Sequence, residues 1–138
     1  MKSNSSIKTI SLAAIKRHSV ESTDWSKTNI LLNNLPEQVK PNDQELPIVY
    51  FMQDNNNWTL LTTQRIIGKI DSQIREIKFE ELDNTIWGNF KSKNIDTTIF
   101  QTIDIHGKQK EFLMETGNSS MAFIYGIKTV ETFYKACN

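Results

Sequence analysis

The stretch WTLLTTQRIIGKIDSQIREIKF, residues 58–79, decides the fold of this chain. Its first run is rich in Thr, Leu and Trp, which suit the pleated surface of a strand better than a helix. A second run contains Gly68, which indicates a bulge, a close backbone approach or a merely tolerated glycine. Asp71-Ser72 marks a turn, after which polar and apolar residues alternate as in a half-buried antiparallel strand. The stretch therefore predicts three antiparallel strands.

Four further runs extend this pattern on both sides and cover residues 48–52, 86–91, 97–105 and 109–115. The first of these is apolar on both parities, which indicates burial on both faces or a strand that bridges two sheets. In the third, two sets of residues lie on opposite faces, namely Ile99, Ile103 and Ile105 against Phe100, Thr102 and Asp104. Seven strands in meander order predict an antiparallel curled sheet or partial barrel.

A helix is expected after Gly117-Asn118-Ser119, where Asn118 or Ser119 would serve as the N-cap. At 100° per residue its apolar residues cluster on one side, and they are Phe123, Gly126, Ile127, Val130, Phe133, Tyr134 and Cys137. Gly126 would let this helix approach the sheet closely. The helix would cap the open end of the curled sheet, so the fold class is α+β.

The N-terminal part reads as a helical extension. One helix is expected over residues 7–17 and a second over residues 24–34, with Thr23 as its N-cap and Pro36 at its end. We interpret Trp25 as a core anchor that docks this hairpin on the main domain, in preference to a ligand-stacking role. The polar, proline-punctuated connection at 36–45 places the domain boundary between residues 1–42 and 43–138.

Composition narrows the possible functions. The chain has 138 residues, which suits one domain, and its 16 basic and 16 acidic residues cancel. Net neutrality argues against a nucleic-acid partner, because such binding needs a basic excess. The single cysteine, Cys137, allows no intrachain disulfide, and no apolar stretch approaches the roughly 20 residues that span a bilayer. We therefore expect a cytoplasmic protein.

No motif of specific chemistry is present. Gly-rich phosphate loops, nucleophile elbows and zinc-type spacings are missing from the sequence, so no cofactor, metal or enzymatic activity is predicted. Asp104 and His106 share one face of a strand, but no third ligand lies near them in the sequence, and His106 falls in an expected turn. The acidic group Glu80, Glu81 and Asp83 reads first as a solvated turn.

A partner-binding patch is the alternative interpretation of that acidic group. We take Glu80, Glu81, Asp83 and the nearby Trp87 as the candidate partner-binding residues.

The order of seven strands and one helix resembles that of bacterial pleckstrin-homology-like (PH-like) domains. The segment LLTTQRIIG, residues 60–68, is similar to their strand, Thr-x-x-Arg, apolar-strand signature. Residues 40–52 resemble the charged lead-in to their first strand, and the likeness extends over residues 43–137. It implies a non-catalytic binding scaffold. Phosphoinositide-binding members use cations around the first loop, whereas residues 53–57 here carry one Asp and no Lys or Arg.

We therefore expect a cytoplasmic bacterial protein-interaction module that binds through a sheet edge, a loop rim or the N-terminal hairpin. An immunity protein that occludes the active site of a toxin is one concrete form of this hypothesis. The alternative is a peripheral membrane or lipid-binding module, which predicts a basic patch or exposed apolar loop tips. An enzyme is expected only if Asp104, His106 and a distant acid converge in one pocket.

Overall fold

The computed structural model of the protein describes residues 2–18, 25–30, 32–91 and 96–136. Within these residues, two helices and eight strands form an α+β fold on two antiparallel sheets. The first sheet has the order β1-β2-β3-β4-β5, with bounds Thr28–Asn29, Pro47–Asp54, Asn57–Thr62, Arg65–Ile70 and Gln73–Lys78. The second has the order β6-β7-β8, with bounds Leu82–Ile86, Thr97–Asp104 and Gln109–Glu115. The helices are α1, Asn4–His18, and α2, Ser120–Lys135.

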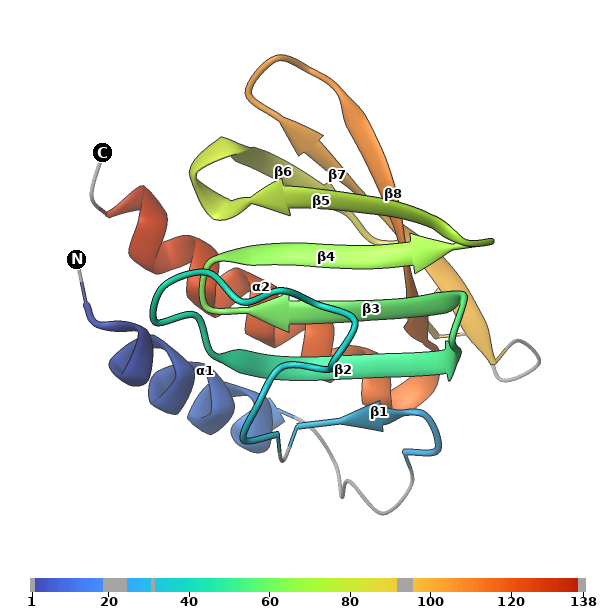
Figure 1. The fold of residues 1–138 in the computed structure, drawn as a ribbon, viewed down its shortest axis with the longest axis horizontal. Coiled ribbons are helices and arrows are strands. Elements are labelled where there is room, and N and C mark those ends of the chain that lie inside the picture. The colour runs from blue at the N-terminus through green and yellow to red at the C-terminus, as the bar shows by residue number, and fades with distance from the viewer. Residues whose placement is uncertain (1, 19–24, 31, 92–95, 137–138) are drawn as a thin grey trace.

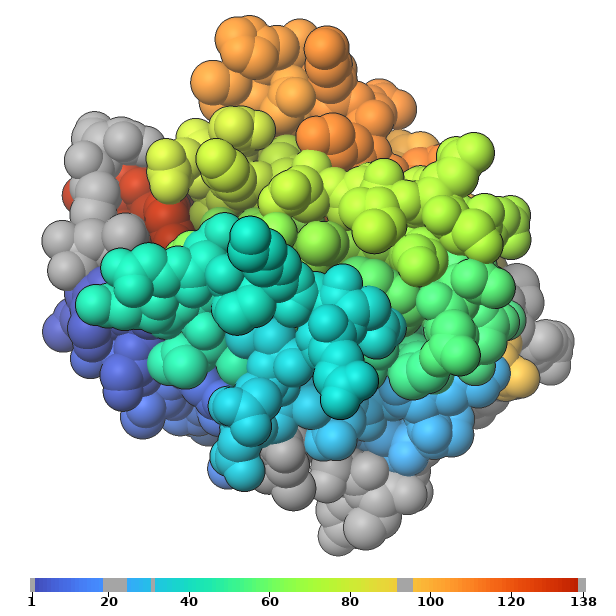
Figure 2. Space-filling model, viewed as in Figure 1, coloured from blue at the N-terminus to red at the C-terminus, as the bar shows by residue number. Residues whose placement is uncertain are grey.

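The central strands of the first sheet, β2 to β4, are largely buried on both faces, whereas β5 is mostly exposed. Figure 1 shows α2 behind the sheet, α1 at its lower left edge and the irregular segment 32–46 crossing in front of β2 and β3. Figure 2 shows the atoms of this segment covering that part of the sheet. On the helix side, Val49, Phe51 and Leu61 join the main core, whereas Trp58 and Leu60 pack under the segment with Val39. Burial on both faces explains why this sequence is apolar on both parities, as predicted for residues 48–52.

The second sheet packs across the helix side of the first, with β8 passing behind β3 and β4 in Figure 1. The Thr59 hydroxyl joins the sheets, because it donates to the Leu113 carbonyl at 2.6 Å and accepts from the Leu113 N–H at 3.1 Å. A Cβ at Gly68 would lie 3.0 Å from Cδ1 of Phe112. The register of β4 is continuous there, so Gly68 serves a close approach and marks no bulge.

The predicted C-terminal helix is confirmed as α2, which buries its apolar stripe against the first sheet. Gly126 also acts as expected, since a Cβ there would lie 2.7 Å from Leu61 and 3.3 Å from Ile15. The α1 helix packs beside α2, and its last-turn His18 stacks on Tyr125 with ring centroids 3.9 Å apart. Cys137 lies outside the described residues.

The second predicted helix, residues 24–34, is wrong for the residues that the structure describes there. The chain instead forms β1, whose Thr28 pairs with Phe51 of β2. The Glu115 carboxylate holds this segment extended. It accepts hydrogen bonds from the N–H groups of Ser26 and Lys27, both at 3.0 Å, and from the hydroxyls of Ser26 and Thr28. Trp25 packs against the main core, as expected of an anchor. The proposed cap Thr23, with Asp24 and Leu31, lies outside the described residues.

The sequence predicts a single curled sheet of seven strands. In the described residues the strands instead form two separate sheets, which include the additional strand β1 and do not close into a barrel. The N-terminal segment supplies Ile7, Ile15 and Ile30 to the same core cluster as the rest of the chain. The domain boundary at residue 42 stays a prediction, and it would require residues 43–138 to fold without these side chains. Among the described residues, no helix has the length and apolarity to cross a bilayer.

Candidate interaction surface

Exposed isoleucines gather on one face of the second sheet. The described residues include six large apolar side chains that are exposed, and three of them, Ile86, Ile99 and Ile105, belong to the β6–β7 region. The remaining three, Ile10, Met52 and Ile74, lie on α1, β2 and β5. Isolated exposed apolar residues are ordinary on protein surfaces, but a group on one face is a candidate binding surface.

Register shows that this group is contiguous. Ile86 of β6 lies opposite Gln101 of β7, so Ile99 and Ile103 are its two diagonal neighbours on the same face. Ile103 is half-buried, and Ile105 follows it at the β7–β8 turn with 61% of its surface exposed. We call Ile86, Ile99, Ile103 and Ile105 the isoleucine face. Their partners on the opposite face of β7, Phe100, Thr102 and Asp104, are buried.

Carboxylates border the isoleucine face. The Ile105 N–H donates to the Glu81 carbonyl at 2.9 Å, which places the acidic segment beside the end of β7. Asp83 is the extra residue where the β6–β7 register shifts, and it is exposed, as are Glu80 and Glu81. Glu111 of β8 lies opposite Gln101, between the isoleucines, and is exposed as well. Of the three acidic residues chosen from the sequence, Glu81 and Asp83 therefore lie at one end of the face, whereas Glu80 lines a pocket with Arg65 and Lys78.

Trp87, the fourth residue chosen from the sequence, lies apart from this group. It follows β6 and is half-buried, with its ring centroid 5.1 Å from that of Phe100 in the core. The structure thus places Glu81 and Asp83 at the end of the isoleucine face but directs Trp87 to the inner side of the sheet.

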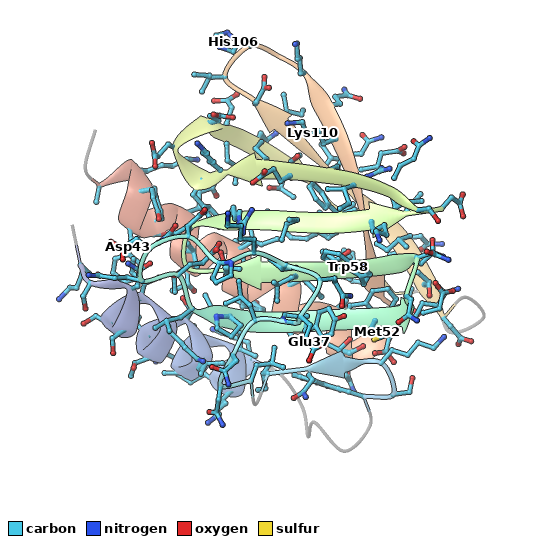
Figure 3. The ribbon with its side chains drawn as sticks, in the orientation of Figure 1. Glu37, Asp43, Met52, Trp58, His106 and Lys110 are labelled. Atoms are coloured by element: carbon cyan, nitrogen blue, oxygen red, sulfur yellow. The ribbon has the colours of Figure 1, made fainter. Side chains whose placement is uncertain are left out.

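Asp104 and His106 form a turn, and within the described part of the chain no further acid joins them in a metal-type group. The Asp104 carboxylate accepts the N–H groups of His106 and Lys108, at 2.8 and 3.0 Å, and thereby closes the β7–β8 hairpin. The hydrogen bond from Lys108 is the main reason that the pKa of Asp104 lies below its usual range. Figure 3 shows His106 at the tip of the hairpin. No three potential metal-ligand side chains gather anywhere in the described residues.

A buried ion pair holds the covering segment 32–46 on the first sheet. The Arg65 Nε donates to Glu45 at 2.8 Å, and its Nη2 donates to Glu45 and to the Lys40 carbonyl. Burial raises the pKa of Glu45, but the hydrogen bonds from Arg65, Thr62 and Asn42 outweigh it, so the pKa is lowered. We call Arg65 and Glu45 the clamp. Because the Arg65 guanidinium donates to groups within the protein, the clamp serves the fold.

A polar pocket of about 340 Å³ lies beside the clamp and is lined by Asn4, Asn42, Gln64, Arg65, Lys78, Glu80 and Tyr134. Its polar groups are largely engaged with one another. Asn4 Oδ1 accepts from Thr63 and Gln64, and the Tyr134 hydroxyl donates to the Thr63 carbonyl at 2.8 Å. The pocket therefore carries less weight as a site than the isoleucine face.

Sequence reasoning found the acidic border but missed the isoleucine face itself. The signal was present in the shared parity of Ile99, Ile103 and Ile105. Parity alone does not say which face of a strand is inside, and the aromatic Phe100 on the other face occupies the core. Family models, curated proteins and solved structures give no match to this chain. The fold and surface define the protein as an α+β protein of two packed antiparallel sheets with an exposed apolar sheet face.

Proposed function

We propose that this protein is a non-catalytic protein-interaction module with a PH-like core, which binds another protein through the isoleucine face. An immunity-type inhibitor that occludes a toxin is one concrete form of this proposal. The order of strands β2 to β8 followed by α2 supports the PH-like part, since seven strands and a closing helix are what the resemblance implies.

The exposed isoleucine face is the observation that carries the proposal. Full burial of one isoleucine contributes about 1.5–3 kcal/mol, so covering several of them yields a substantial part of a specific binding free energy. Polar and acidic residues surround the apolar centre, as at many protein interfaces. A three-stranded sheet also offers a firm, preformed surface, which lowers the ordering cost of association.

A peripheral membrane module is the second candidate, and one observation favours it. Ile105 is an exposed apolar side chain at a hairpin tip that also carries His106 and Lys108. The β2–β3 loop gives this candidate no support. Its Asp54 accepts the Asn56 N–H at 2.8 Å, which is the main cause of its lowered pKa. A lipid phosphate at this loop would therefore meet a negatively charged carboxylate.

Comparative capture tests the proposal. Tagged wild-type protein, the variant Ile86→Thr/Ile99→Thr/Ile105→Thr and the control Ile74→Thr are used as baits in the native cells. Threonine keeps the β-branched shape that strands favour, so all three baits should unfold at similar temperatures. Ile74 is a matched control, because its exposure of 61% equals that of Ile105 but it lies on the first sheet.

We expect one stoichiometric protein with the wild type and the control, and its loss with the triple variant. Equal recovery with all three baits would refute binding through the isoleucine face. Recovery of no protein, together with sedimentation of the wild type on anionic vesicles, would replace this proposal with the membrane candidate.

A further inference from the structure

We infer that the partner presents a positively charged surface around the apolar side chains that cover the isoleucine face. This inference rests on the proposed function and specifies the chemistry of the partner. Three observations carry it: the face is bordered by carboxylates, these carboxylates have no partner among the described residues, and they would repel a second copy of this chain.

The face and its border are acidic. Of the charged side chains on β7 and β8, Glu111 is the one that is exposed, since Asp104 and Glu115 are buried and Lys110 is half-buried. Glu81 and Asp83 add two carboxylates at the end next to Ile105. Two cations lie nearby, Lys108 in the turn and Arg75 of β5, whose Nη1 donates to the Glu111 carbonyl at 3.2 Å. Lys110 belongs to the opposite parity, and its Nζ donates to the Glu76 carbonyl on β5 at 2.8 Å (Figure 3 labels Lys110).

The border carboxylates of Glu81, Asp83 and Glu111 are available to a partner. All three residues are exposed, and their side chains make no hydrogen bond or ion pair with the described residues. Glu45, Glu115 and Asp104 differ, since the carboxylate of each accepts hydrogen bonds from donors within the protein. Lysine and arginine on a partner would therefore gain charge-assisted contacts at the border, and their arrangement would fix which partner is accepted.

The same charges disfavour a second copy of this chain as the occupant. A two-fold pairing places the same patch on both copies in contact. Glu111 and the acidic end would then meet carboxylates of equal sign across an apolar contact. A basic partner matches both the apolar centre and the acidic border of the face, whereas a second copy of this chain matches only the apolar centre.

A pair of defined peptides tests the inference without a known partner. The first probe is a short synthetic helix with leucines on one side and lysines on the other, and the second carries glutamates in place of the lysines. Each is titrated into isotope-labelled full-length protein at low salt, and amide shifts are followed by NMR. We expect the lysine helix to shift the amides of Ile86, Ile99 and Ile103, and the glutamate helix to leave them unchanged.

Charge reversal supplies the control. Glu81→Lys/Asp83→Lys should weaken binding of the lysine helix about tenfold, as expected for the loss and reversal of exposed charge pairs. Glu37→Lys/Asp43→Lys makes the same change in net charge on the segment that covers the first sheet, where Figure 3 labels both residues, and should leave the affinity unchanged. Equal binding of both helices, binding of neither, or equal effects of both variants would overturn the inference. The capture experiment would still decide the proposed function separately.

Discussion

At the scale of single residues, the pair formed by Arg65 and Glu45 shows how a charge is kept inside this protein. The side chain of Glu45 has 0% of its surface exposed and that of Arg65 has 8%. Removing Glu45 leaves the buried Arg65 with only its ion pair to Glu76 at 3.1 Å and its hydrogen bond to the Lys40 carbonyl. Glu45→Ala should therefore cost about 3 kcal/mol of unfolding free energy, the lower end of the usual range for a broken buried pair. Urea unfolding measures this value. The double variant Glu45→Leu/Arg65→Met should recover part of the loss, and no recovery would contradict the explanation.

Gly88 gives a second prediction at this scale. A Cβ there would lie 2.1 Å from the Ile99 carbonyl oxygen, which belongs to the backbone and cannot turn aside. Gly88→Ala should therefore destabilise the protein by about 1–3 kcal/mol, as overpacking usually does. Gly107→Asn is the control, because a Cβ there would meet nothing within 4 Å and Asn tolerates the φ of +80°. Thermal unfolding of both variants compares them, and equal losses would contradict the steric reason.

At the scale of elements, α1 stabilises the protein through one face. Ile15 is fully buried between the helices and the first sheet, whereas Ile10 on the same helix is 38% exposed. Ile15→Ala should cost about 2–5 kcal/mol. Ile10→Ala should cost less, about 1 kcal/mol, since its side chain is partly exposed and alanine is the better helix former. Similar losses in chemical unfolding would mean that α1 does not pack as described and would favour the boundary at residue 42.

Elements with strong local patterns were predictable, and those fixed by distant contacts were not. The α2 helix follows from its apolar stripe, and β3 to β5 follow from residues 58–79. The predicted helix over 24–34 failed because its local pattern competes with Glu115, a residue 89 positions from Ser26 in the sequence, which holds the backbone extended. Likewise, the parity of β7 was predictable, but packing of Phe100 decided that the isoleucines face outward.

At the scale of the whole molecule, stability should depend on pH through carboxylates with lowered pKa values. Burial raises the pKa of Glu115, but hydrogen bonds from Ser26, Thr28 and Lys27 outweigh it and leave the pKa lowered, as for Glu45. Such groups stabilise the fold fully above their unfolded pKa, and this contribution is lost as the pH falls through the folded pKa.

The midpoint of thermal unfolding should therefore stay level from neutral pH to about pH 5 and fall below about pH 4.5. A series of melts across this range measures it. Glu115→Gln should flatten the acid limb. A midpoint that instead rises on acidification would show that these carboxylates are better stabilised in the unfolded chain.

The central claim is that another protein covers the isoleucine face, and site-specific photo-cross-linking in the native cells tests it most directly. A photoreactive amino acid is placed at position 99, on the face, and at position 74, as the matched exposed control. The account predicts a cross-linked adduct of one defined mass at position 99 and none at position 74. Adducts at position 74 alone, or none at either position, would contradict it.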